Sequence, residues 1–230
     1  MNSAPQNMPS WPEISLSSAE TETLFRYYND ACVILEYGSG GSTVAASEKR
    51  DKLVFSVESD HVWAIRLQYE IDLRNLPSPA LVYHVDIGPT GHWGRPLGPE
   101  AWTRFHRYPL AIWDEPFFRQ PDVILIDGRF RPACLLAVLL RTQKPVTVLF
   151  DDYAQRPAYH SVEAFLKPTE MVGRMAVFDV EPRSFDPSET GALMAHFFRA
   201  SYHGRANYST TSSEHSSIGF ETQIKDQGHD

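Results

Sequence analysis

The sequence predicts an α/β protein whose doubly wound, mostly parallel sheet lies between two layers of helices. Apolar segments of strand length alternate with longer segments of helical character through most of the 230 residues, as expected for a parallel sheet. The first apolar segment leads directly into a glycine-rich turn. Several later ones end in carboxylates, at the edge where open parallel sheets bind ligands.

The individual elements follow from apolar runs, caps and breakers. A helix is expected over 19–29, because Ser17 or Ser18 can cap it and acidic residues occupy its first turn. Strands are then predicted at 32–36, 53–58, 81–86, 122–126, 146–150 and 175–180. Further helices are predicted at 42–49, 61–74, 132–141, 158–166 and 187–202.

One of these helices, 61–74, carries an apolar stripe typical of a helix that packs on a core. At loosely helical spacing it contains Val62, Ile65, Tyr69 and Leu73, with Leu67 off the stripe. Both cysteines, Cys32 and Cys134, fall in apolar segments, so we expect them to be buried and reduced.

Length and composition indicate one domain. We assign it to residues 1–202, with a long insertion at 88–120 and a polar, weakly ordered tail at 203–230. A net charge of -8 argues against nucleic acid as the main partner. The chain shows neither a signal-peptide pattern nor an apolar run long enough to span a membrane, which favours a soluble cytoplasmic protein without a membrane partner.

The most informative segment is the turn after the first predicted strand. Residues 33–42 read V-I-L-E-Y-G-S-G-G-S, so a buried strand ends at Gly38, Ser39 and Gly40 before a helix opens at Ser42. Glycines at this point let the backbone turn sharply and let a ligand approach closely. The segment predicts a nucleotide-binding turn, and a purely structural turn is the alternative.

Two features of the turn separate the candidate nucleotides. The dinucleotide fingerprint G-x-G-x-x-G requires a third glycine where this chain has Thr43. Glu36 stands two residues before Gly38, and this acid-x-G-x-G opening resembles motif I of the class I S-adenosylmethionine-dependent methyltransferases. In that motif the third glycine would fall at Ser42, although Gly41 precedes it here.

A second acid lies in register with the first. Glu58 ends the strand at 53–58, 20 residues after Gly38. An acid in this position of a βαβ unit can accept both ribose hydroxyls of a nucleotide. Dinucleotide-binding and methyltransferase folds both use such an acid. The alternative is that Glu58 caps the helix beginning near His61.

Five segments taken in order resemble a bacterial group of methyltransferase-like proteins: E-Y-G-S-G-G-S-T, V-E-S-D, V-D-I-G, I-D-G-R-F-R and F-D-D-Y. The resemblance covers about residues 15–200. It implies a Rossmann-like methyltransferase fold, a three-layer sandwich, and S-adenosylmethionine as the cofactor. The cofactor-binding residues that it implies are Glu36, Gly38, Ser39, Gly40, Glu58 and Asp127.

The acceptor side of this predicted site uses residues further along the chain. Asp127 is the expected catalytic residue, closest to the transferred methyl group. Arg129 and Arg131 follow it and are expected to clamp a carboxylate or phosphate of the acceptor, with ordinary surface charge as the alternative. Trp93, in the insertion, is expected to touch the acceptor. His160 is a candidate general base, with a structural role as its alternative.

Metal dependence is a further hypothesis. Metal-dependent small-molecule O-methyltransferases have acids at the positions of Asp127, Asp151 and Asp152, which suits Mg²⁺. Arg129, however, occupies the position of a further ligand and would repel a cation, so no metal ligand is assigned. The predicted function is S-adenosylmethionine-dependent methyl transfer, at oxygen, to a small-molecule or glycan acceptor. The alternatives are a catalytically silent nucleotide-binding module and an NAD-type oxidoreductase.

Overall fold

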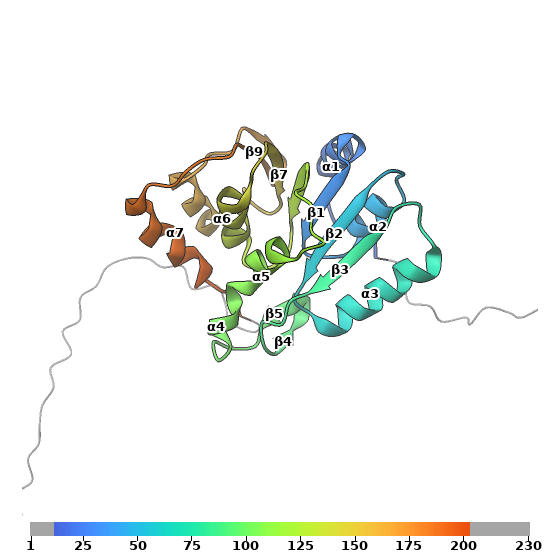
Figure 1. Ribbon diagram of the computed structural model, residues 1–230, viewed down its shortest axis with the longest axis horizontal. Coiled ribbons are helices and arrows are strands. Elements are labelled where there is room, and N and C mark those ends of the chain that lie inside the picture. Colours follow the sequence, from blue (N-terminus) through green and yellow to red (C-terminus); the bar gives the residue numbers. More distant parts are fainter. Residues whose placement is uncertain (1–11, 203–230) are drawn as a thin grey trace, which may run out of the picture.

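The computed structural model describes residues 12–202, so the predicted tail at 203–230 lies outside the described residues. A seven-stranded sheet crosses the molecule with the strand order β3-β2-β1-β6-β7-β9-β8 (Figure 1). Its first five strands are parallel: β3 (Ala80–His84), β2 (Leu53–Glu58), β1 (Val33–Tyr37), β6 (Val123–Ile126) and β7 (Val146–Phe150). The predicted doubly wound, mostly parallel sheet is confirmed, and its order reverses between β1 and β6.

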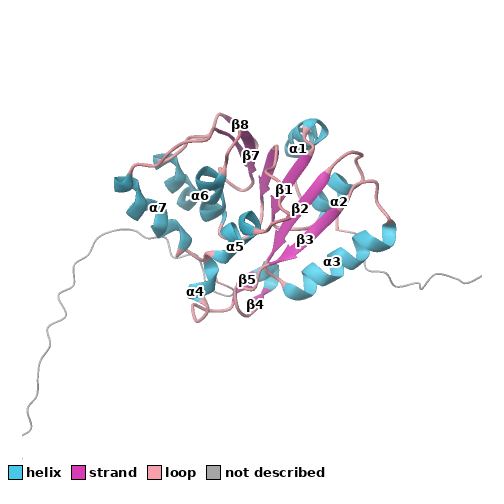
Figure 2. Cartoon of the chain, viewed as in Figure 1, coloured by secondary structure: helices cyan, strands magenta, loops and turns pink. Residues whose placement is uncertain are grey.

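Helices cover both faces of this sheet (Figure 2). One layer contains α1 (Ser18–Asp30), α2 (Gly41–Ser47) and α3 (His61–Arg74), and the other contains α5 (Arg107–Leu110), α6 (Arg131–Arg141) and α7 (Thr190–Phe197). Side chains alternate between the layers along each strand. In β1, Ile34 packs with α1 and α2, whereas Leu35 packs with α6. The three-layer arrangement is confirmed.

The end of the sheet differs from the predicted pattern. β9 (Met175–Val180) lies where a strand was expected, but it runs antiparallel to β7 and pairs with β8 (Glu170–Val172) in a hairpin that was not predicted. Gly173, with φ 58°, begins the two-residue turn between these strands. Residues 157–164 form a 3-10 helix in place of the α-helix expected at 158–166. The helix expected from Pro187 to 202 is a short 3-10 turn followed by α7.

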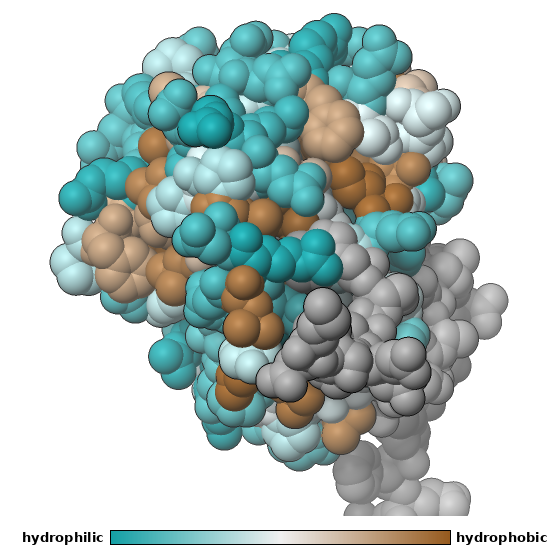
Figure 3. Space-filling view, turned by 90° about the vertical axis from the view of Figure 1, so that its right-hand side faces the viewer, coloured by the Kyte–Doolittle hydropathy of each residue, from teal (hydrophilic) through white to brown (hydrophobic). Residues whose placement is uncertain are grey.

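The face of α3 that packs on the sheet is not the predicted one. The expected stripe is exposed: Val62, Ile65, Tyr69 and Leu73. The buried side chains are instead Ala64, Leu67 and Ile71. The small Ala64 side chain lets the helix lie close to Val82 of β3 and to Val44 of α2, and close packing there determines the buried face. Figure 3 shows this side of the molecule, where apolar residues interrupt a hydrophilic surface.

The insertion at 88–120 packs against the end of the sheet. It contains the hairpin β4 (Thr90–Gly91) and β5 (Arg95–Pro96), with a 3-10 turn between them, then α4 (Trp102–Phe105), α5 and a 3-10 turn at Ala111–Asp114. Trp113 Nε1 donates to the Tyr37 hydroxyl at 2.7 Å, and that hydroxyl donates to Pro109 O at 2.6 Å. The insertion is therefore anchored to β1 by buried hydrogen bonds.

The two cysteines differ in exposure. Cys134 is buried as expected, but Cys32 is exposed, because it immediately precedes the amino-terminal end of β1. Both thiols are free. Within residues 12–202, no helix has the length and apolar character required to cross a bilayer.

Arg131 ties together the loops that follow β6 and β7. Its side chain is 6% exposed. The guanidinium donates to Gly128 O at 3.0 Å, to Asp127 O and Oδ1 at 2.8 Å, and to Asp151 O at 2.7 Å. Asp151 and Asp152 lie within 3.6 Å and 3.4 Å of the same guanidinium. One cation thus satisfies carbonyl and carboxylate oxygens from both loops.

Replacing Arg131 should destabilise the fold strongly. Arg131→Met would leave buried carboxylates and carbonyls without their donor, and breaking a buried ion pair from one side costs about 3–5 kcal/mol. Urea unfolding measures this loss in the free energy of unfolding. Arg104→Gln is the matched control, because Arg104 and Asp86 form an exposed pair that is worth at most about 1 kcal/mol. Equal losses in the two variants would contradict this role for Arg131.

Candidate functional site

The turn after β1 and the turn after β6 touch through their backbones. Gly38 has φ 102°, and a Cβ atom there would lie 2.7 Å from Gly128 N. A Cβ atom on Gly128 would in turn lie 2.7 Å from Gly38 N and would overlap the Tyr108 hydroxyl. Only glycine permits this approach at either position. The contact brings the carboxyl ends of β1 and β6 to one place, where the strand order reverses.

Glu36 holds the glycine turn from behind. Its carboxyl group is fully buried and accepts hydrogen bonds from the Tyr28 hydroxyl at 2.6 Å and from Thr43 Oγ1 at 2.5 Å. Thr43 Oγ1 also accepts a hydrogen bond from Gly40 N at 3.0 Å. Burial raises the pKa of Glu36 to about 7, against the lowering effect of these hydrogen bonds. Glu36 was predicted to bind the cofactor; it is not one of the residues that line the pocket, and its hydrogen bonds instead shape the turn that does.

Glu58 reaches the same turn from β2. Its Oε1 accepts from Ser59 N at 2.7 Å and Asp60 N at 2.8 Å, and its Oε2 accepts from Ser39 Oγ at 2.8 Å. The cap of α3 is Asp60, whose Oδ1 accepts from Trp63 N at 2.9 Å. The carboxylate of Glu58 is therefore fixed in direction, and its Oε2 side faces the glycine turn.

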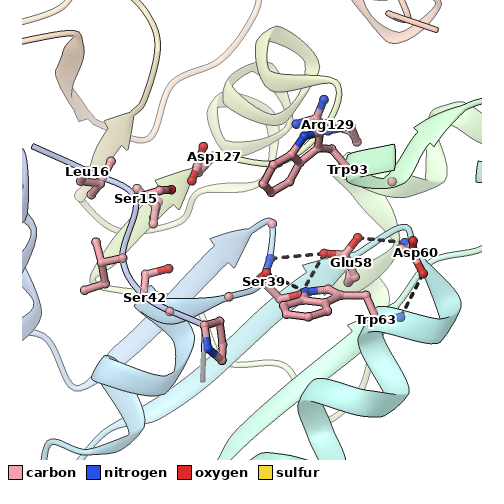
Figure 4. A pocket seen from close by; sticks show the side chains of 18 of the residues that line it. Ser15, Leu16, Ser39, Ser42, Glu58, Asp60, Trp63, Trp93, Asp127 and Arg129 are labelled. Atoms are coloured by element: carbon pink, nitrogen blue, oxygen red, sulfur yellow. Dashed lines mark hydrogen bonds between the residues drawn. The ribbon is translucent and has the colours of Figure 1, made fainter. Parts of the chain in front are cut away.

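A pocket of about 460 Å³ opens over these strand ends (Figure 4). Its size suits a nucleotide-sized ligand. Seven residues assigned to the site from the sequence line it: Gly38, Ser39, Gly40, Glu58, Trp93, Asp127 and Arg129. A Cβ atom on Gly40 would meet no protein atom within 4 Å. Figure 4 shows Ser39 and Trp63 on one side of the opening and Arg129 and Trp93 on the other.

The lining of the pocket is rich in acids. Four carboxylates contribute to it, from Glu13, Glu58, Asp60 and Asp127, against the single guanidinium of Arg129. Carboxylates lower the energy of a bound cation and raise that of a bound pyrophosphate. The lining therefore suits a ligand that carries positive charge better than it suits a pyrophosphate, and the open position at Gly40 leaves room for a ligand against the turn.

Asp127 occupies the central position, directly after β6. Its side chain is 35% exposed and forms an ion pair with Arg131 at 2.8 Å. Burial raises the pKa of Asp127 to about 7; Arg131 lowers it, and the charges of Asp151 and Asp152 raise it further. A carboxyl group poised near neutral pH inside a pocket is typical of a residue that binds a cation or moves a proton.

Two residues predicted for the acceptor side do not line the pocket. Arg131 is buried beneath it and uses its guanidinium on the two loops, so it cannot clamp an acceptor. His160 lies on the far side of the loop after β7, where its Nε2 is 3.0 Å from Tyr153 O and its ring packs on the Tyr153 ring at 4.7 Å. The structural role weighed for His160 fits this position.

The three aspartates considered for Mg²⁺ are paired with arginines. Besides Arg131, Arg174 Nε lies 2.9 Å from Asp151 Oδ1, and Arg156 Nη2 lies 3.0 Å from Asp152 Oδ2. In the described part of the chain, no cluster of three or more acids, histidines or cysteines has a geometry that holds a metal ion. Guanidinium groups thus take the place that a cation would need.

The N-terminal segment forms a wall that the sequence did not reveal. Residues 12–16 line the pocket, and Arg174 Nη2 donates to Ser15 O at 3.0 Å. A Cβ atom on Gly41 would lie 2.6 Å from Ile14 N, so this glycine is needed for the close crossing. Gly41, the third glycine of the run, is the sequence signal that could have indicated this crossing. Trp63 and Tyr108 are further lining residues that were not predicted.

A solved structure of a related protein identifies the family of this chain. No protein-family model matches the chain, and no curated protein does. A crystal structure of a methyltransferase-like protein from Silicibacter pomeroyi DSS-3 matches with 45% identity and a TM-score of 0.78, covering 82% of this chain and 98% of that chain. An S-adenosylmethionine-dependent O-methyltransferase from Thermotoga maritima matches at 8% identity, with a TM-score of 0.46, over 76% of this chain and 68% of that one. This second likeness is too distant to bear on the site.

The first comparison extends over nearly the whole of the relative at an identity that leaves no ambiguity about common descent. The chain therefore belongs to the same family as this methyltransferase-like protein, and it has the Rossmann-like fold of the class I methyltransferases.

Proposed function

We propose that this protein binds S-adenosylmethionine in the acid-lined pocket and transfers its methyl group to an oxygen of a small-molecule or glycan acceptor. The observation that carries the proposal is the combination of a glycine turn with four lining carboxylates. A phosphate-binding turn would be expected to avoid acids, whereas a cofactor with a sulfonium and an ammonium group is attracted by them. The family relationship supports the same activity.

The roles proposed for the residues follow from their positions. The turn at Gly38, Ser39 and Gly40 receives the cofactor, and Glu58 accepts hydrogen bonds from its ribose hydroxyls in place of the Ser39 hydroxyl. Bound S-adenosylmethionine supplies an electrophilic methyl group. Asp127 attracts the cofactor's positive charge and can take the proton that an acceptor hydroxyl loses, because its pKa lies near neutral pH.

The oxidoreductase alternative is disfavoured by Thr43. The third glycine of a dinucleotide turn would stand there, but Thr43 is fully buried and bonds both Glu36 and Gly40 N.

An activity assay distinguishes an active methyltransferase from a catalytically silent binding module. Protein incubated with S-adenosylmethionine and a panel of hydroxyl-bearing small molecules and sugars should form the demethylated cofactor, and mass spectrometry should locate the new methyl group on oxygen. Cofactor binding without turnover on any hydroxyl, amine or thiol acceptor would favour the silent module.

Gly40→Val should weaken cofactor binding without harming the fold. A Cβ atom at this position, in the pocket lining, would meet no protein atom within 4 Å, so the new side chain has room beside the protein and competes with the ligand. We expect at least a tenfold rise in the dissociation constant for S-adenosylmethionine, since steric overlap costs about 1–3 kcal/mol, and little change in the melting temperature. Isothermal titration and thermal unfolding measure the two effects.

The matched control is Gly191→Val, at the exposed start of α7, where a Cβ atom also meets nothing within 4 Å. It should leave both quantities unchanged. If Gly40→Val bound the cofactor as tightly as this control, the pocket would not be the cofactor site.

Cofactor affinity should rise with pH through about 7 and then level off. Below that value Asp127 is largely protonated and neutral, and the positive cofactor must displace a proton to gain an ion pair. The groups that face Asp127 are Arg131 of α6, Asp151 and Asp152 after β7, and Glu36 of β1. Titrations at pH 6 in buffers of different ionisation enthalpy should detect proton release on binding.

Asp127→Asn separates this effect from the titration of Glu36, whose pKa also lies at about 7. The variant should bind more weakly above pH 7 and show a flatter dependence of affinity on pH. An unchanged pH profile in Asp127→Asn would remove Asp127 from the cofactor's surroundings.

A further inference from the structure

Two arginines beside the pocket have no partner within the described residues. Arg129 follows β6 and lines the pocket, but no hydrogen bond or ion pair of its guanidinium is found within residues 12–202. Arg95, in β5, is likewise unpaired over that range, and its Nε is buried without a hydrogen-bond partner. Buried polar groups in proteins nearly always have partners, so the buried Nε of Arg95 beside the unpaired guanidinium of Arg129 requires an explanation.

The two side chains lie close enough to affect one another. Burial lowers the pKa of Arg129, and the positive charges of Arg131 and Arg95 lower it further. Arg95 directly follows Gly94, which lines the pocket beside Trp93. Figure 4 shows Arg129 and Trp93 together on the wall across from Ser39. Arg95 therefore brings a second positive charge to the side of the pocket that Arg129 forms.

The acids near these arginines are already engaged. Asp127, Asp151 and Asp152 pair with Arg131, Arg174 and Arg156. The two carboxylate oxygens of Glu58 accept five hydrogen bonds, all from Ser39, Ser59 and Asp60. Repulsion between two partly desolvated cations is unfavourable. Glu58 and Asp127 also line the pocket, but other donors already hold their carboxylates. An anion from outside the chain would offset the repulsion.

The backbone next to Arg95 is also strained. Trp93 has φ 62° and ψ 29°, the left-handed region that bulky residues seldom occupy, and its side chain is 70% exposed. Such strain is commonly retained at functional sites. It holds the indole in the pocket wall beside Arg129, where a planar part of a ligand can pack against it.

We propose that Arg95 and Arg129 form an oxyanion subsite that binds a carboxylate or phosphate group of the methyl acceptor. The proposal rests on the proposed function, since it places the acceptor beside the cofactor pocket. It replaces the pairing of Arg129 with Arg131 that the sequence suggested, because Arg131 is used inside the protein. Guanidinium groups suit this task through their paired, directional donors.

The test uses the full-length protein saturated with the demethylated cofactor. Inorganic phosphate is titrated calorimetrically in one arm and acetate in the other, with sodium chloride balancing the ionic strength. We expect saturable binding of at least one anion, and the tighter of the two identifies the group. Arg95→Gln and Arg129→Gln should each weaken that binding about tenfold or more, since a hydrogen bond to a charged group contributes about 1.5–3 kcal/mol.

Arg104→Gln serves as the control, because Arg104 is exposed and pairs with Asp86; it should bind the anion like the unaltered protein. Neither test variant removes a side-chain hydrogen bond or ion pair found within the described residues, so both should fold. Absence of saturable anion binding in protein that binds the cofactor would overturn the subsite and leave the proposed function standing. A comparable loss of cofactor affinity in Arg95→Gln and Arg129→Gln would overturn it too, by assigning the arginines to the cofactor's own carboxylate. Failure to bind the cofactor at all would instead contradict the proposed function.

Discussion

The buried carboxyl group of Glu36 is the interaction on which the site depends. It lies at the end of β1, and its hydrogen bonds reach Tyr28 of α1 and Thr43 of α2. Through Thr43 it also fixes Gly40 N. Burial raises the pKa of the group to about 7, whereas the hydroxyl donors around it favour the ionised carboxylate. The glycine turn is thus shaped from beneath, which leaves its upper surface free to meet a ligand.

The charges around the pocket divide into two sets. Beneath it, Arg131, Arg174 and Arg156 neutralise the aspartates that follow β6 and β7. Around the opening, the acidic residues Glu58 and Asp127 and the basic residue Arg129 share one lining. A pocket whose wall carries charges of both signs is suited to hold a cation and an anion side by side.

Much of the fold and part of the site could be predicted from the sequence, because strand ends and glycines carry strong local signals. β2, α3, β7 and β9 begin and end where the apolar runs predict. The buried face of α3 could not be predicted from the sequence. Periodicity points to the face with the most hydrophobic side chains, whereas close packing against the sheet buries the face with the small Ala64 side chain. β8 is too short for a pattern, although Gly173 marks its turn. In the site, spacing located the glycines, Glu58, Asp127 and Arg129. It could not separate Arg129 from Arg131, because burial depends on tertiary contacts, and it could not place residues 12–16 or Arg95 beside the pocket.

The most direct test of the account is the identity of the nucleotide that this pocket prefers. Thermal unfolding of the protein would be followed with S-adenosylmethionine, its demethylated product, NAD, NADP and ATP in parallel. We expect stabilisation by the first two ligands, by about 2.7 kcal/mol at a concentration 100-fold above the dissociation constant. Stabilisation by NAD or NADP alone, with no response to S-adenosylmethionine, would contradict it.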